Sequence, residues 1–146
     1  MSAVLNRNIC FIGGGNMAQA LIGGLISRGL PSTRITVSDP VEQVRHLLAE
    51  KDLVVTEDNA SAIREADVVV LAVKPQVLAN VLKPLNGLFD GKLIISIVAG
   101  AEIATIAALA GSNRIVRVMP NTPALVQTGA HGLYAVSYTH LRAHET

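Results

Sequence analysis

Residues 9–18 read ICFIGGGNMA, and this stretch decides the fold that we expect. Its first four residues are apolar and typical of a β-strand, and three glycines end the run. Gly13, Gly15 and Ala18 then have the spacing G-x-G-x-x-A. In dinucleotide-binding proteins the first small residue permits a tight turn, the second lets the backbone approach a pyrophosphate, and the third lets helix and strand pack closely. We therefore expect phosphate groups at the N-terminus of a helix that begins near Asn16.

The residues that follow support a phosphate-binding turn over a glycine-rich turn that binds nothing. Apolar side chains recur at helical spacing from Met17 onward, so the motif follows a strand and opens a helix. A second predicted strand, 35–38, ends in Ser38 and is followed by Asp39. This position lies about twenty residues past the glycines, where an acidic residue commonly meets the adenosine ribose.

Composition limits the possible functions. The 146 residues are 50% hydrophobic and 16% charged, which favours one domain with a substantial core. A net charge of +1 gives no electrostatic reason to expect nucleic acid or an anionic membrane as a partner. The single cysteine, Cys10, lies within a predicted strand and excludes an internal disulfide. Glycines, Asn16 and Gln19 make 9–26 a poor membrane span or signal peptide, so we expect a cytoplasmic protein.

Strand and helix patterns alternate along the chain. Strands are predicted at 9–12, 35–38, 53–55, 68–73, 93–97 and 115–118, and helices at 16–27, 40–50, 59–66, 76–85 and 102–110. Six alternations predict an α/β fold of the Rossmann type, a doubly wound parallel sheet with strand order 3-2-1-4-5-6. In the second helix, Val41, Val44, Leu47 and Leu48 are expected to face inward.

The last residues do not continue this pattern. Residues 136–146 read VSYTHLRAHET, with no clear apolar face, and a frayed tail or residues foreign to the natural protein would explain them. His140 and His144 stand four residues apart, but no third ligand is evident nearby, so we expect no metal site.

The loops at the expected carboxyl ends of the strands hold small residues, prolines and amides. They contain no Ser-His-Asp set, no carboxylate pair and no cysteine–histidine pair, so we assign no catalytic residue. Hydride transfer suits such loops, because the cofactor carries the chemistry and the protein positions it. Lys74 is the one cation there, and Asn121 and Thr122 stand in a loop made rigid by Pro120 and Pro123.

Five segments together resemble the pyrroline-5-carboxylate reductase family. They are FIGGGNMAQALIGGL (11–25), SDP (38–40), ADVVVLAVKPQ (66–76), LIISIVAG (93–100) and RVMPNTPAL (117–125). The resemblance covers about residues 8–135, so we expect an NAD(P)-binding domain over 1–135. It implies transfer of a hydride from NAD(P)H to the C=N carbon of pyrroline-5-carboxylate, a cyclic imine carboxylate, which gives L-proline.

The resemblance also implies which residues contact the cofactor. These are Gly13, Gly14, Gly15, Asn16 and Met17 at the pyrophosphate, Ser38, Asp39, Pro40 and Asn59 around the adenosine ribose, and Ala72, Val73, Lys74, Pro75, Ala99, Gly100, Asn121, Thr122 and Pro123 toward the nicotinamide. Family members continue into a helical second domain, which forms homo-oligomers and most substrate contacts. This chain supplies no such domain, so it resembles the cofactor-binding half of a reductase.

Cofactor choice and function have alternatives at this point. Asp39 favours NADH because its charge repels a 2′-phosphate, whereas Ser38 and Arg45 can contact that phosphate and the family implies NADPH. An NAD(P)-sensing module without chemistry, or a related two-domain hydroxy-acid dehydrogenase, would share the glycine loop.

Overall fold

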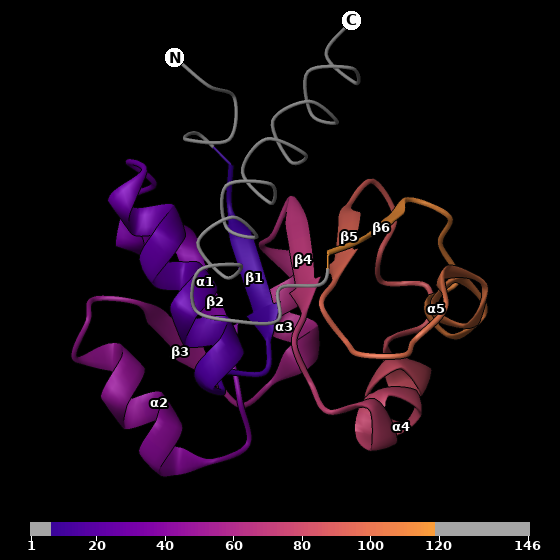
Figure 1. Cartoon of the computed structure of the whole chain (residues 1–146), viewed down its shortest axis with the longest axis horizontal. Helices are drawn as coiled ribbons and strands as arrows, with labels where there is room; N and C mark the ends of the chain where they lie inside the picture. Colours follow the sequence, from indigo (N-terminus) through magenta and orange to yellow (C-terminus); the bar gives the residue numbers. More distant parts are fainter. Residues whose placement is uncertain (1–6, 119–146) are drawn as a thin grey trace, which may run out of the picture.

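A computed structural model describes residues 7–118, which form a six-stranded parallel sheet (Figure 1). The strand order is β3-β2-β1-β4-β5-β6, which confirms the predicted fold class and topology. The strands are β1 (Ile9–Ile12), β2 (Ile35–Ser38), β3 (Val54–Thr56), β4 (Val68–Leu71), β5 (Leu93–Ser96) and β6 (Ile115–Arg117). The α-helices are α1 (Asn16–Ser27), α2 (Glu42–Ala49), α3 (Asn59–Arg64), α4 (Leu78–Leu82) and α5 (Ile103–Ala110).

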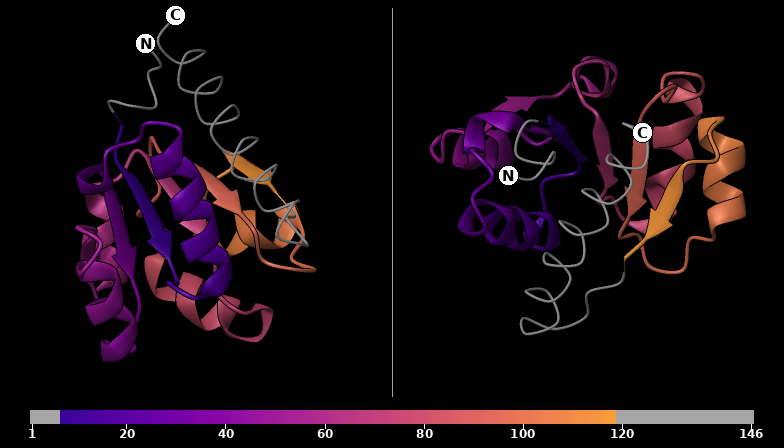
Figure 2. Two further views of the ribbon diagram at one scale, coloured as in Figure 1. Left: turned by 60° about the vertical axis from the view of Figure 1, so that its left-hand side comes forward. Right: turned by 90° about the horizontal axis from the view of Figure 1, so that it is seen from above.

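The helices cover the sheet in two layers (Figures 1 and 2). Buried side chains of α1 and α2, among them Leu21, Leu25 and Leu48, pack with one face of the strands. Those of α3, α4 and α5, among them Ile63 and Leu82, pack with the opposite face. The helix after β1 therefore lies on one face and the helix after β4 on the other. Because β1 and β4 are neighbours, the strand order reverses between them, and ligands of open parallel sheets bind beyond such a point.

The strand register brings the ends of the central strands together. Ile12 at the end of β1 pairs with Ser38 of β2 and with Leu71 of β4. The ladder extends one residue further, because the Gly13 N–H donates to the Ser38 carbonyl at 2.8 Å and the Ala72 N–H to the Ile12 carbonyl at 2.9 Å. The loops that follow β1, β2 and β4 therefore begin side by side at the same edge of the sheet.

Two helix predictions need correction. In α2 only Leu48 is buried and Val44 half-buried, whereas Val41 is 49% and Leu47 45% exposed. Val41 precedes the helix in extended conformation, and Leu47 points about 100° away from the buried face.

The helix predicted over 76–85 is divided into a 3₁₀ turn (Pro75–Val77), α4 and a second 3₁₀ turn (Lys83–Leu85). Pro84 has no N–H to donate to the Asn80 carbonyl, and this interrupts the regular α-helical ladder. For the other helices and strands, the observed ends differ from the predicted ends by a few residues at most.

Cys10 is fully buried in the middle of β1, as its position in the strand predicts. Burial raises the pKa of its thiol from 9.0 to about 12, and Lys92 partly offsets that rise. The thiol therefore stays protonated at neutral pH and acts as a small apolar side chain. Among the described residues, no helix has the length and apolar character to cross a membrane.

Candidate functional site

A cleft of about 760 Å³ lies where β1, β2 and β4 end. It brings together ten of the predicted cofactor-binding residues, which come from four separate loops. They are Gly13, Gly14, Gly15, Ser38, Asp39, Pro40, Asn59, Ala72, Val73 and Lys74. Its position is the reversal point of the sheet, where an elongated ligand can contact several loops at once.

Gly13 makes the turn that leaves β1. Its φ is +103°, a conformation that residues with a Cβ rarely adopt. A Cβ on Gly13 would lie 2.7 Å from the Ala72 carbonyl oxygen, a backbone atom that cannot rotate away. Glycine is therefore required here both by the backbone angle and by the approach of β4.

Gly14, the middle glycine of the loop, is buried. A Cβ on it would come within 2.9 Å of both Leu48 Cδ1 and Val37 Cγ1, and 3.1 Å from Val44 Cγ1. Gly14 thus lets the loop sit closely on β2 and α2. The G-x-G-x-x-A motif gives its middle position no task, so only the packing of α2 reveals this requirement.

Gly15 has the opposite surroundings. It is exposed, its φ and ψ of −74° and −170° are accessible to any residue, and nothing lies within 4 Å of a Cβ built on it. Gly15 is also the N-cap of α1, where no side chain accepts from the first N–H groups and no acidic residue occupies the first turn. The partial positive charge of this helix end is therefore left for an anion, and a pyrophosphate fits that space.

The helix start and the small residue of the motif are as predicted. Asn16 and Met17 are the first two residues of α1 and are exposed beside Gly15. Ala18 is 1% exposed and packs in the core under the strands. The side chain of Gln19, one turn into the helix, donates to the Gly14 carbonyl at 2.9 Å.

Asp39 contacts the protein's own backbone. Its Oδ2 accepts from the Gly14 N–H at 2.9 Å, and its Oδ1 accepts from the Val41 N–H at 2.8 Å. Arg45 donates from Nη1 to the Asp39 carbonyl at 2.9 Å, and the same nitrogen lies 3.7 Å from Oε2 of Glu57. The Glu57 side chain is 73% exposed, so this pair is largely screened by solvent.

Ser38 is buried and already bonded. It is 1% exposed, and its hydroxyl donates to Oδ1 of Asn59. Asp58 caps α3, since its Oδ1 accepts from the N–H groups of Ala60 at 3.1 Å and Ser61 at 3.4 Å. The contact between Ser38 and Asn59 thus joins the end of β2 to the start of α3, and Asp58 is the N-cap of that helix.

The remaining predicted residues are divided between other places. Pro75, Ala99 and Gly100 line a separate hollow of about 390 Å³, together with Leu78, Ala79, Ala101, Glu102, Thr105 and Leu109. Asn121, Thr122 and Pro123 lie outside the described residues, as do His140 and His144. The structure thus separates the pyrophosphate and ribose residues from part of the set expected near the nicotinamide.

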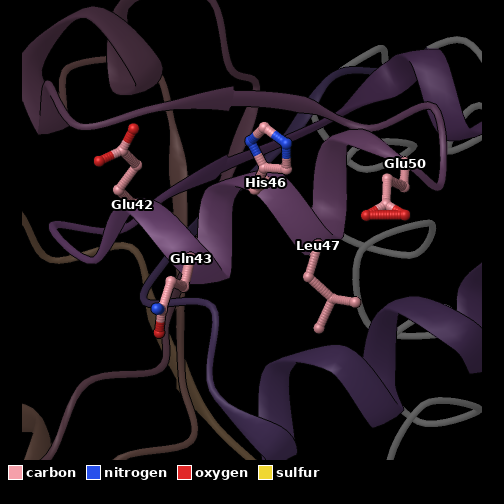
Figure 3. A pocket seen from close by; sticks show the side chains of 5 residues that line it. All are labelled: Glu42, Gln43, His46, Leu47 and Glu50. Carbon is pink, nitrogen blue, oxygen red and sulfur yellow. The ribbon is translucent and has the colours of Figure 1, made fainter.

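A further hollow of about 420 Å³ lies along α2 (Figure 3). Its side chains are Glu42, Gln43, His46, Leu47 and Glu50, all presented by one helix and its end. Within residues 7–118 no group of three or more His, Cys, Asp or Glu side chains is placed to hold a metal ion.

Sequence reasoning missed one wall of the main cleft. Val77, Asn80, Val81, Pro84 and Leu85 line it from α4 and the turns around it. These residues belong to no motif, and only one feature of the sequence indicates that they line the cleft. The crossover after β4 must pass on the far side of the sheet from α1, which places α4 opposite the glycine loop.

Fold and site together define a class of protein. A parallel sheet of order 3-2-1-4-5-6, a glycine turn and an uncapped helix N-terminus in a cleft make a nucleotide-binding domain of the Rossmann type. Residues 8–100 match the family model described as "NADP oxidoreductase coenzyme F420-dependent", and the chain belongs to this family.

Similarity to individual proteins extends further along the chain. The pyrroline-5-carboxylate reductase of Haemophilus influenzae is 50% identical over 136 residues, which are 92% of this chain and 50% of that protein. A solved pyrroline-5-carboxylate reductase from Coxiella burnetii is 40% identical with a TM-score of 0.77, and the match covers 82% of this chain and 46% of that one.

The Plasmodium falciparum enzyme, solved with NADP bound, is 31% identical with a TM-score of 0.73 over 85% of this chain and 46% of that one. The resemblance predicted from the sequence is thus confirmed. The chain spans about half the length of the curated relatives it matches.

Proposed function

We propose that this chain supplies the cofactor-binding half of a pyrroline-5-carboxylate reductase. The reaction is reduction of 1-pyrroline-5-carboxylate, a cyclic imine carboxylate, to L-proline with NAD(P)H as the hydride donor. The 50% identity to a reductase of this name supports the reaction class, and the cleft supports the cofactor. The reductases of this name are 31–50% identical to the chain, whereas a solved 3-hydroxyisobutyrate dehydrogenase is only 22% identical, which favours this function over a hydroxy-acid dehydrogenase.

One observation carries the cofactor proposal. The glycine loop is pinned at Gly13 and Gly14 and open at Gly15, directly before the uncapped end of α1. Backbone N–H groups and a helix dipole in that arrangement bind phosphate without any cationic side chain. The residues present therefore fit a dinucleotide.

The other residues of the cleft receive the remaining parts of the nucleotide in this proposal. Gly13 to Met17 would hold the pyrophosphate, and Asp39, Pro40 and Asn59 would surround the adenosine ribose. The nicotinamide half of the cofactor would contact Ala72, Val73 and the exposed Lys74 in the cleft. It would extend to Pro75, Ala99 and Gly100 in the second hollow. NAD(P)H would supply the hydride when bound, and this chain's residues would position it.

Several finer statements belong to the same proposal. We place the protein in the cytoplasm and assign 1–135 to the nucleotide-binding domain. From the family description and the NADP-bound relative, we infer that NADPH is preferred to NADH as the cofactor. We also infer a homo-oligomeric complete enzyme without nucleic-acid or membrane partners. The acidic residues Glu57 and Asp58 also line the cleft, and their charges disfavour a 2′-phosphate, so the titration compares both nucleotides.

A titration tests the cofactor part and a turnover assay tests the reaction. The purified chain is titrated with NADPH and, separately, with NADH, and bound nucleotide is followed by its fluorescence and by heat. We expect saturable binding of both and tighter binding of NADPH. Oxidation of NADPH is then followed with pyrroline-5-carboxylate. Reduction of NADP is followed with a 2-hydroxy acid, which represents the competing substrate class.

The outcomes separate the candidate functions. Turnover of the cyclic imine alone supports the reductase assignment, and turnover of the hydroxy acid alone would replace it. Binding without either reaction would leave a nucleotide-sensing module or a half-enzyme that requires a second domain. A folded chain that binds neither nucleotide would contradict the cofactor proposal.

A further inference from the structure

The acid at the end of β2 in this fold is generally assigned to the adenosine ribose, where it accepts from the 2′-hydroxyl. In this chain that acid is Asp39, which is half-buried. Both of its carboxylate oxygens accept from backbone N–H groups, Oδ2 from Gly14 at 2.9 Å and Oδ1 from Val41 at 2.8 Å. The contacts thus point into the protein, toward the glycine loop on one side and the start of α2 on the other.

The Gly14 peptide is held from both ends. Its N–H is bonded to Asp39, and its carbonyl accepts from Nε2 of Gln19 at 2.9 Å. Below it, Leu48 and Val37 leave no room for even one more carbon atom. Two hydrogen bonds and close packing thus hold this peptide, and Gly15 and the first N–H groups of α1 follow it directly.

We propose that Asp39 is a positioning residue that fixes the pyrophosphate-binding loop, and that it does not select between NADH and NADPH. This inference rests on the proposed nucleotide site and assigns its carboxylate a different partner. Without the bond to Asp39, the Gly14 N–H loses its acceptor and the loop samples other positions. Nucleotide affinity then falls by the fraction of time that the loop spends in the binding position. Because the pyrophosphate is common to both nucleotides, the loss is the same for both.

Selection by charge predicts a different result. If the carboxylate faced the ribose, removing its charge would weaken NADH and strengthen NADPH. The ratio of the two dissociation constants therefore distinguishes positioning from selection. A merely structural role would change unfolding but leave the ratio and the loop amides of the folded protein unaffected.

The experiment compares Asp39→Asn with Asp58→Asn in the full chain. Both variants remove one negative charge from the same cleft, but Asp58 caps α3, and asparagine is an equally good cap. Asparagine at 39 keeps one oxygen for two N–H groups, so one bond is lost. We expect Asp39→Asn to weaken NADPH and NADH alike, by about tenfold relative to Asp58→Asn. We also expect hydrogen exchange at the Gly14 amide to become about tenfold faster, with Ala60 unaffected.

Each outcome decides the inference. A changed NADH-to-NADPH ratio in Asp39→Asn beyond that of Asp58→Asn would overturn it, and so would an affinity equal to that of Asp58→Asn. Should Asp39→Asn not fold, the wild-type chain gives the answer through nuclear magnetic resonance. A scalar coupling between the Gly14 amide nitrogen and the Asp39 carboxyl carbon supports the bond, and its absence contradicts it. A wild-type chain that binds neither nucleotide refutes the proposed function alone, because this coupling still tests Asp39.

Discussion

The main cleft and the hollow beside Ala99 both lie beyond strand ends, yet they differ in volume and in the residues that line them. The cleft measures about 760 Å³ and contains the glycine loop, whereas the hollow measures about 390 Å³ and lies between the residues after β4 and those after β5. At the cleft, neighbouring strands β1 and β4 send their helices to opposite faces. At the hollow, β4 and β5 send α4 and α5 to the same face, where Leu82 and Ile106 belong to one cluster.

The direction of the crossovers explains this difference. Helices that depart to opposite faces leave a gap between the two loops that precede them, and a ligand can enter between these loops. Helices on the same face pack against each other and close most of that gap. The glycines at the two sites differ in their surroundings. Gly13 allows close contact with Ala72, whereas Gly100, with a φ of +73°, faces open space.

The largest effect is expected from alanine substitutions at these two glycines. Both have positive φ, so both variants carry backbone strain of about 1–2 kcal/mol. Gly13→Ala adds the contact of 2.7 Å with the Ala72 carbonyl, and we expect its free energy of unfolding to fall by about 3 kcal/mol or more, with nucleotide binding lost. Gly100→Ala should cost about 1 kcal/mol.

Urea unfolding followed by circular dichroism measures both values, and the difference between the variants isolates the contact. Equal losses of stability would show that the loop moves freely away from Ala72. In that case the cleft would be no more tightly built than the hollow.

A smaller effect, on binding alone, is expected at Gly15. Gly15→Leu places a side chain in the open space before α1, where the pyrophosphate is proposed to lie. We expect affinity for NADPH to fall by at least about 30-fold. Unfolding should change by at most about 1 kcal/mol, because leucine is a poorer N-cap than glycine.

Gly23→Ala is the matched control for Gly15→Leu. Gly23 lies within α1, and a Cβ there also meets nothing within 4 Å. This variant should stabilise the helix by about 0.5–1 kcal/mol and leave nucleotide affinity unchanged. Binding by Gly15→Leu at wild-type strength would refute the assignment of the glycine loop.

The fold could be predicted because its signals are local and repeated. The glycine motif indicated the first strand and helix. The fully apolar segment 68–73 predicted a central strand buried on both faces, and β4 occupies its first four residues, all of them buried. Alternation of strands and helices then left few topologies, of which the observed order is the common one. The divided α4 was harder to predict, because an apolar helical pattern continues through Pro84 and hides the break.

The site could be predicted in outline but not in its contacts. Sequence spacing brings Asp39 to the glycine loop, yet it cannot show which way the carboxylate turns, because that depends on the N–H groups of Gly14 and Val41. The task of Gly14 depends on Leu48 and Val37, which reach it only through tertiary packing. Asn80 and Val81 belong to a segment more than sixty residues from the motif, and only the crossover after β4 places them in the cleft.

A further prediction joins the two regions. If the nicotinamide end of the cofactor extends from the cleft toward the hollow, Ala99→Leu should weaken NADPH by about tenfold, because the added side chain occupies exposed space beside Gly100. The same variant should bind 2′,5′-ADP with wild-type affinity, since 2′,5′-ADP contains only the adenosine end of NADPH. Calorimetry with both ligands makes the comparison. Equal affinity for NADPH in wild type and variant would confine the nucleotide to the cleft.

The smallest effect is expected from the two residues that precede helices at these sites. Asp58 begins α3 at the cleft and accepts from Ala60 and Ser61, whereas Glu102 begins α5 at the hollow without a side-chain cap. Asp58→Ala should therefore lower the free energy of unfolding by about 1 kcal/mol, and Glu102→Ala should change it by less than about 0.5 kcal/mol.

Urea midpoints with a shared m-value measure both changes, and Asp58→Asn should restore the wild-type midpoint. The difference matters for the site, because the capped α3 carries Asn59, the partner of the Ser38 hydroxyl. A loss in Glu102→Ala as large as that in Asp58→Ala would mean that side-chain capping does not distinguish the two strand ends. Their difference would then lie in the glycine loop alone.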